Sequence, residues 1–204
     1  MLVLASSSPR RRELLAQAGF VFTVAPPAIP EELRSGESPI AYVTRLAREK
    51  AQAVWARNSA NDREGDPLLV LGADTTVVSA DGQILEKPAD ETDATRMLRL
   101  LSGTTHKVIT GVALVSAAAI EVAAEVTYVS LLTLSDAEIA AYVAGGESMD
   151  KAGAYGIQGK ASRWVPRVHG CYFNVMGLPL ALVSSMIEGA QIRAARDSHA
   201  EAPV

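Results

Sequence analysis

Three consecutive arginines stand at the predicted start of the first helix, where positive charge is normally unfavourable. Residues 6–9 read Ser-Ser-Ser-Pro, with Ser8 as N-cap, and residues 10–12 are arginines. The helix dipole makes this end partly positive, so an exposed cation there costs about 0.3–1 kcal/mol. Backbone N–H groups, hydroxyls and guanidinium groups here predict a phosphate site built from Ser6, Ser8, Arg10 and Arg11. The alternative is an exposed basic turn paired with nearby acidic residues.

Asp74 interrupts an apolar run, residues 68–78, that is otherwise typical of buried strand. A buried carboxylate needs a metal ion, a basic partner or a raised pKa to offset its desolvation. Equally, Asp74 could close one strand at a tight turn with its side chain in water. Lys50 lies on the apolar stripe of a predicted helix, and there its ammonium is expected to reach solvent at the edge of the stripe.

Further polar residues are predicted in loops. Glu31, Glu32 and Glu86 are expected in solvent, although their oxygens suit Mg²⁺ and any of them could join Asp74 as a metal ligand. Lys87 follows a predicted hairpin and is also expected to be exposed. Gln158 lies in a loop punctuated by glycines, where the backbone either approaches a ligand closely or turns tightly. Its amide suits the edge of a base, and a surface glutamine is the alternative.

The elements that must position these residues alternate between strands and helices, which predicts an α/β fold with a mixed sheet. Helices are expected at 8–19, 38–55, 91–101, 135–145 and 178–187, and strands at 2–5, 68–71, 75–78, 83–85, 108–115, 121–131 and 164–169. We expect one domain of two lobes over residues 1–190. Residues 191–204 are expected to form a frayed C-terminal tail.

Composition limits the classes of function. The chain has 204 residues, 49% of them hydrophobic, and a net charge of −4, which argues against a duplex nucleic-acid binder. Cys171 is the only cysteine, which suits a reducing compartment, and His106 and His169 are expected to be structural or exposed. The N-terminus lacks the features of a signal peptide, and no apolar stretch approaches membrane-spanning length. These features predict a soluble, cytoplasmic protein without a membrane partner.

Motifs along residues 2–183 resemble the Maf family of nucleotide pyrophosphatases. Residues 4–15 read Leu-Ala-Ser-Ser-Ser-Pro-Arg-Arg-Arg-Glu-Leu-Leu. The family's other motifs follow in its order at 46–51 (Leu-Ala-Arg-Glu-Lys-Ala), 72–75 (Gly-Ala-Asp-Thr), 87–88 (Lys-Pro), 102–103 (Ser-Gly), 110–111 (Thr-Gly), 150–159 (Asp-Lys-Ala-Gly-Ala-Tyr-Gly-Ile-Gln-Gly) and 174–179 (Asn-Val-Met-Gly-Leu-Pro). Each motif alone is weak evidence, whereas the ordered set is highly specific.

The resemblance implies an elongated, two-lobed α/β fold with a central cleft, similar to the inosine-triphosphatase-like architecture and commonly homodimeric. It implies hydrolysis of a nucleoside triphosphate between the α and β phosphates, giving the monophosphate and pyrophosphate, with a divalent metal, Mg²⁺ or Mn²⁺. The Pro-Arg-Arg, Asp-Thr and Ile-Gln-Gly combination resembles the branch that acts on dTTP and UTP, rather than the branch that prefers 7-methyl-GTP.

The matched positions assign expected roles to the residues. Asp74 takes the family's proton-acceptor position, while Lys50 and Lys87 are expected to stabilise charge on the departing pyrophosphate. Arg10, Thr75 and Gln158 match the positions that distinguish subfamilies. The predicted metal ligands are Asp74 with Glu31 or Glu32.

Two other classes of function stay open. A nucleotide-binding regulator of cell division or septum formation, with little or no hydrolysis, would share the binding motifs. Such a binder has no need of a base, so the combination of Asp74, Lys50 and Lys87 favours the enzyme. If the chain were a structural or interaction protein, the arginines of the first helix and Asp74 would have no explanation.

Overall fold

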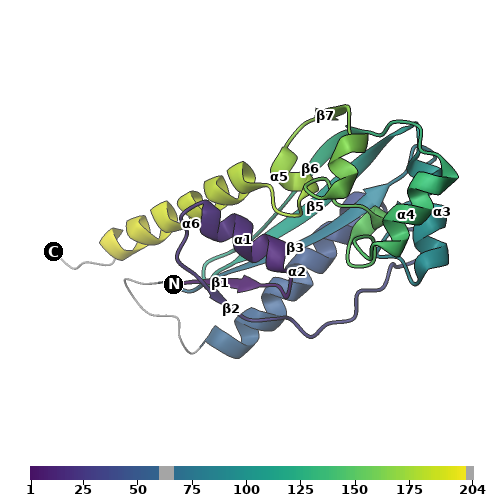
Figure 1. Ribbon diagram of the computed structural model, residues 1–204. Coiled ribbons are helices and arrows are strands. Elements are labelled where there is room, and N and C mark those ends of the chain that lie inside the picture. The colour runs from purple at the N-terminus through teal and green to yellow at the C-terminus, as the bar shows by residue number, and fades with distance from the viewer. Residues whose placement is uncertain (60–66, 201–204) are drawn as a thin grey trace. The chain divides into compact units, whose positions relative to one another are not determined.

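The structure is a computed structural model that describes residues 1–59 and 67–200, with side chains to Arg196. The elements in chain order are β1 (Leu2–Ala5), α1 (Pro9–Gln17), β2 (Thr23–Val24), α2 (Pro39–Asn58), β3 (Leu69–Val78), β4 (Ile84–Leu85), α3 (Glu91–Leu101), β5 (Thr105–Val115), β6 (Ile120–Ser130), α4 (Asp136–Ala144), the 3-10 helices η2 (Ala152–Ala154) and η3 (Lys160–Trp164), β7 (Arg167–His169), α5 (Tyr172–Val175) and α6 (Leu180–Ala200) (Figure 1).

Within the described residues, seven strands form one sheet in the order β2-β1-β3-β5-β6-β7, and β4 pairs with β3. β1 runs parallel to both β2 and β3, whereas β4 is antiparallel to β3 and β7 is antiparallel to β6. The register of β1 on β3 places Ala5 opposite Gly72, two residues before Asp74 on β3. The predicted α/β fold with a mixed sheet is therefore confirmed.

The chain divides into two compact units. Unit 1 comprises 1–74, 111–124 and 177–204, and unit 2 comprises 75–110 and 125–176. Because β3, β5 and β6 each contribute residues to both units, the chain passes repeatedly from one unit to the other. In unit 1, α2 packs its apolar stripe on β1, β3 and β5, with Val3, Ala47, Val54, Val70 and Ala113 in the core.

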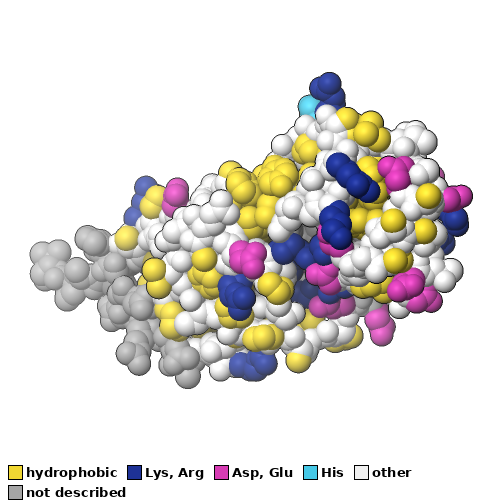
Figure 2. Space-filling view, in the orientation of Figure 1, with side chains coloured by type: hydrophobic (Ala, Val, Ile, Leu, Met, Phe, Trp, Pro, Cys, Tyr) yellow, Lys and Arg dark blue, Asp and Glu magenta, His cyan; other side chains and the backbone are white. Residues whose placement is uncertain are grey.

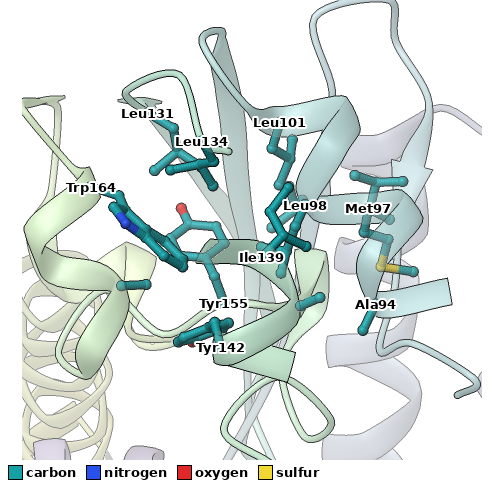
Figure 3. Close-up of a cluster of buried hydrophobic side chains, with 14 of the residues drawn as sticks. Ala94, Met97, Leu98, Leu101, Leu131, Leu134, Ile139, Tyr142, Tyr155 and Trp164 are labelled. Carbon is teal, nitrogen blue, oxygen red and sulfur yellow. The ribbon is translucent and has the colours of Figure 1, made fainter. Parts of the chain in front are cut away.

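The core of unit 2 is the larger hydrophobic cluster. Leu98 and Leu101 of α3 and Ile139 of α4 point toward one another, and the rings of Tyr155 and Trp164 lie beside them (Figure 3). His106 is buried in this unit, and its Nε2 lies 2.8 Å from the Tyr155 hydroxyl. Burial lowers the pKa of His106 to about 4, so the ring is neutral at pH 7. The predicted structural role of His106 is confirmed.

Sequence patterns placed most helix starts correctly. Ser8, Ser38 and Ser135 each cap a helix through the side chain, and Ser135 forms the predicted capping box with Glu138. The predicted break in the strand run at residues 72–74 is wrong, because β3 is continuous from Leu69 to Val78. Residues 164–166 were predicted as strand but precede the short β7, and the short β2 and α5 were not predicted.

The last helix is longer than its apolar stretch indicates. It was predicted to end near Ile187, whereas α6 continues to Ala200. Among its described side chains, which reach Arg196, the last buried one is Ala190, so the apolar periodicity gave no signal beyond that residue. No helix among the described residues is long and apolar enough to cross a membrane.

Candidate functional site

Asp74 and Lys50 form a buried ion pair in unit 1. The Lys50 Nζ donates to Asp74 Oδ1 at 2.7 Å, and each residue is only 5% exposed. The expectation that Lys50 extends to solvent is wrong, because its ammonium is buried with a carboxylate partner. Of the two alternatives for Asp74, the structure shows the buried, compensated carboxylate. Breaking such a pair by removing one partner costs about 3–5 kcal/mol, so the pair is a fixed feature of the unit.

A close contact between α2 and β3 brings these two residues together. A Cβ added at Gly72 would lie 2.2 Å from the Ala47 carbonyl oxygen and 2.9 Å from the Ala51 backbone nitrogen. Only glycine permits this approach of strand to helix. Lys50 follows Ala47 by less than one helical turn, and Asp74 follows Gly72 by two residues along β3. The glycine of the Gly-Ala-Asp-Thr motif therefore sets the distance between lysine and aspartate.

Glu31 and Arg11 complete the charged group around Asp74. The Lys50 Nζ also contacts Glu31 Oε1 at 2.9 Å, so one ammonium bridges two carboxylates. The Arg11 guanidinium donates through Nε to the Gly177 carbonyl and through NH1 to the Ala73 carbonyl, each at 2.8 Å. Arg11 therefore ties the first helix to the residue before Asp74, in addition to its predicted role toward phosphate.

The environment of Asp74 favours proton acceptance. Burial raises the pKa of Asp74 above its ordinary value, while the charges of Lys50 and then Arg11 lower it. The balance lies on the raised side, which makes the carboxylate a better base near neutral pH than an exposed aspartate. Its second oxygen, Oδ2, is buried and accepts no hydrogen bond from the described residues. One oxygen of Asp74 is therefore held by Lys50, and the other is buried without a hydrogen-bond donor among the described residues.

The start of α1 keeps its predicted polar groups in one turn. Ser8 caps the helix by accepting from the Arg11 backbone N–H, and Ser6 is buried and accepts from the Ser8 N–H at 3.1 Å. A hydroxyl that accepts these bonds can still donate to an anion. Arg10 is half-buried in the first turn. The first turn of α1 contains no acidic residue. No carboxylate of this turn therefore offsets the partial positive charge of the helix N-terminus.

Thr75 belongs to a chain of hydroxyl groups in unit 2. Its Oγ1 lies 2.9 Å from Thr110 Oγ1, and Thr110 donates to the Asn174 carbonyl at 3.1 Å. The Asn174 amide donates to the Val108 carbonyl at 3.0 Å and to Thr127 Oγ1 at 2.9 Å. Thr110 and Asn174 are fully buried. The side chain of Thr75 is therefore oriented by groups from the Thr-Gly and Asn-Val-Met-Gly-Leu-Pro motifs.

Gln158 is exposed in unit 2. The backbone of its loop donates hydrogen bonds to the side chains of Tyr142 and Glu147. The Glu147 carboxylate accepts from the Lys160 N–H at 3.1 Å and from the Tyr142 hydroxyl at 2.8 Å. A Cβ at Gly159 would lie 2.0 Å from Glu147 Oε1. Glycine at this position leaves room for the end of the Glu147 side chain.

The remaining predicted residues are exposed. Lys87 is exposed in unit 2, and Glu32 is exposed in unit 1, with its carbonyl bound by Arg45. Among the described residues, no group of three or more His, Cys, Asp or Glu side chains could hold a metal. On the face drawn in Figure 2, acidic and basic side chains are interspersed.

Sequence reasoning missed several residues that support the site. Thr110 and Asn174 lie in motifs that carried the resemblance but received no role. Arg45, on the buried side of α2, was also missed, although a charge flanked by Val43 and Leu46 in the apolar stripe is a detectable signal. Tyr142 and Glu147 carry no recognisable sequence signal, because the backbone groups that they bind, at Gly156 and Lys160, lie 13 or 14 residues away in the chain.

Comparisons with known proteins cover nearly the whole chain. Residues 1–190 match the family model described as "Maf-like protein". The chain is 54% identical over 191 residues to the dTTP/UTP pyrophosphatase of Koribacter versatilis, covering 94% of this chain and 95% of that one. It is 49% identical over 199 residues to the dTTP/UTP pyrophosphatase of Salmonella typhimurium, covering 97% and 98%. The protein of the same name from Geobacter sulfurreducens is 52% identical over 184 residues, covering 89% and 92%.

Proposed function

The chain belongs to the Maf family, and from that membership we propose that it is a nucleoside triphosphate pyrophosphatase that hydrolyses dTTP and UTP between the α and β phosphates. The products are the nucleoside monophosphate and pyrophosphate. Relatives named dTTP/UTP pyrophosphatase support the substrate class. The observation that carries the proposal is the buried Asp74 carboxylate, whose one oxygen is held by Lys50 and whose other oxygen has no hydrogen-bond donor among the described residues.

Asp74 acts as the general base in this proposal. A water oxygen attacks the α phosphorus, its proton passes to Asp74, and the bond from the α phosphorus to the bridging oxygen breaks. The electron pair of that bond leaves with pyrophosphate. A raised pKa suits this role, because it brings the proton affinity of Asp74 closer to the working pH. Lys50 holds the carboxylate in place through Oδ1.

The charge of the substrate requires several cations. Arg10, Arg11, Lys50 and Lys87 stabilise negative charge that develops on the departing pyrophosphate, and Ser6 and Ser8 donate to phosphate oxygens at the start of α1. Donors and cations that are fixed before the reaction contribute most, because they need not reorganise in the transition state. The contacts of Arg11 with two backbone carbonyls support such fixed placement.

The residues present fit a divalent cation, Mg²⁺ or Mn²⁺. Asp74 offers a buried oxygen that accepts no hydrogen bond from the described residues, and Glu31 shares the Lys50 ammonium with Asp74. Mg²⁺ is commonly bound by one or two carboxylates together with substrate phosphates and waters, so a larger cluster is not required. When bound, the cation would neutralise phosphate charge and acidify a water. We favour Glu31 over Glu32, because Glu31 carries the carboxylate that reaches Lys50.

Base selection is assigned to Arg10, Thr75 and Gln158. An exposed amide on a firmly held loop can pair with the O4 and N3–H edge of uracil or thymine, whereas cytosine would require the flipped amide. The backbone bonds of the loop to Glu147 and Tyr142 support a fixed orientation. The family resemblance supports a homodimer, and the single cysteine suits a location in the cytoplasm.

Pyrophosphate release from dTTP, UTP, CTP and 7-methyl-GTP, with and without Mg²⁺, tests the proposal. We expect metal-dependent release from dTTP and UTP, reduced by about 10²-fold or more in Asp74→Asn, since general base catalysis contributes about 10²–10⁴-fold. Asp136→Asn is the matched control, because that carboxylate lies exposed in the first turn of α4. Gln158→Ala should change the preference among bases and keep the metal dependence.

Other outcomes separate the alternatives. Release mainly from 7-methyl-GTP would keep the reaction and overturn the assigned bases. Binding of dTTP without any release would instead favour the nucleotide-binding regulator.

A further inference from the structure

The loop that carries Glu31 is fastened to α2 by a buried guanidinium. Arg45 donates through Nε to Glu37 Oε1 and through NH2 to Glu37 Oε2, both at 2.7 Å. The same NH2 donates to the Glu32 carbonyl at 2.9 Å. Arg45 is 8% exposed, so these bonds form away from solvent. We call Arg45 and Glu37 the loop clamp.

Further bonds hold the two ends of the same segment. The hydroxyl of Tyr42, which is 1% exposed, donates to the Glu31 carbonyl at 3.2 Å. At the other end, Glu37 Oε2 accepts from the Arg34 backbone N–H at 3.2 Å. The carbonyls of Glu31 and Glu32 are therefore both bound to α2, the helix that also carries Lys50.

The Glu31 side chain needs this support because it is itself poorly enclosed. It is 49% exposed, whereas the Lys50 side chain that it contacts is 6% exposed. An exposed side chain on a loop without helix or strand keeps its position only if its backbone is fixed. A guanidinium fork that binds both oxygens of one carboxylate supplies such a fixed point, because the geometry is bidentate and rigid.

We propose that Arg45 and Glu37 are positioning residues, which hold the Glu31 carboxylate against Lys50 and beside Asp74 and thereby set the rate of the reaction. The inference rests on the proposed pyrophosphatase activity. Neither residue touches the reacting atoms, and both act through the loop. The bidentate bond to Arg45 holds the pKa of Glu37 at about 2, so the clamp stays ionised throughout the neutral range.

A double-mutant cycle tests the inference. Arg45→Lys keeps the charge and loses the fork, and Glu37→Gln keeps the shape and loses the charge. Each change should lower kcat for dTTP about 10- to 100-fold, as expected for a catalytic group displaced by about 1 Å. In a Glu31→Gln background, the same changes should lower kcat by no more than about twofold, because the clamp acts through Glu31. Arg48→Lys is the matched control, an exposed arginine on the same helix.

Two results would overturn the inference. One is an equal fold-loss from Arg45→Lys with and without Glu31, which would indicate a general structural role. The other is an unchanged kcat in both Arg45→Lys and Glu37→Gln. Amide hydrogen exchange of residues 31–37 gives a readout that needs no activity, and it should be faster in both clamp variants than in Arg48→Lys. If the wild-type protein released no pyrophosphate, the proposed function would fail, while unchanged exchange would overturn the clamp separately.

Discussion

The Lys50 ammonium links the two carboxylates of the candidate site. It lies between Glu31 and Asp74, so two acidic groups share one cation. Removing Lys50 would leave Asp74 buried without its closest compensating charge, and the pKa of Asp74 would rise further, since Lys50 lowers it. The pair thus serves both to keep Asp74 ionisable near neutral pH and to orient it.

Asp74→Asn should change the pH dependence of stability. The folded pKa of Asp74 is raised, so the folded chain holds this proton at pH values where the unfolded chain has released it. The contribution of Asp74 to the free energy of unfolding is therefore lost as pH rises through that window. Asparagine does not titrate, so the stability of Asp74→Asn relative to wild type should increase as pH rises from the ordinary pKa of aspartate to the raised pKa of Asp74 in the folded chain.

Urea unfolding at a series of pH values measures this difference. The Asp136→Asn variant makes the same chemical change at an exposed position and supplies the reference trend. A difference for Asp74→Asn that stayed constant with pH, or followed the Asp136→Asn trend, would contradict a raised pKa at Asp74.

At the scale of elements, two glycines set how closely strands approach α2. Gly72 of β3 packs on the Ala47 carbonyl, and a Cβ at Gly111 of β5 would lie 2.4 Å from the Val43 carbonyl oxygen. Both glycines belong to motifs of the predicted family. Glycine is needed at both positions for packing, because a larger residue would move β3 or β5 away from α2, the helix that carries Lys50.

Gly72→Ala should therefore destabilise the protein and reduce activity together. Inserting a methyl group against backbone atoms costs about 1–3 kcal/mol or more in a packed core. The shift would also separate Lys50 from Asp74, so kcat should fall. Gly189→Ala is the matched control: the residue lies within α6, its added Cβ meets nothing nearer than 3.4 Å, and alanine favours a helix by about 0.5–1 kcal/mol.

Thermal and urea unfolding measure both glycine variants. The free energy of unfolding should fall in Gly72→Ala, whereas in Gly189→Ala it should stay equal to that of the wild type or rise. A Gly72→Ala protein with wild-type stability and kcat would show that the contact between α2 and β3 does not set the site.

At the scale of the whole molecule, α6 contributes buried side chains as far as Ala190, and the described side chains beyond it, to Arg196, are exposed or half-buried. Val183 and Ile187 are buried, and Met186 and Ala190 are nearly so. From residue 191 to Arg196 the side chains are exposed or half-buried, and Arg193 pairs with Glu121 at the surface. The core of unit 1 therefore needs the helix only to about Ala190, which is also where the match to the family model ends.

A chain that ends after Ala190 should fold and remain active. The loss of one surface ion pair and an exposed helix end should cost about 1 kcal/mol or less in free energy of unfolding. A chain that ends before Val183 should lose cooperative unfolding, because it exposes the buried face beneath the helix. Circular dichroism melting and pyrophosphate release check both truncations. Equal loss in the two truncations would show that the last ten residues of α6 contribute to the fold.

The sequence by itself determined the helix starts, most strands, the mixed α/β class and the family motifs, because each depends on local spacing. Ser-Pro starts, the Ser135 capping box and periodic apolar residues all act within a few positions of the chain. The tertiary structure alone decided that Lys50 is buried, that Glu31 rather than Glu32 reaches it, and that Arg45 and Glu37 fasten the loop. Ion pairs form between segments far apart in the chain, and periodicity reports which face of a helix is buried but not which charge it meets.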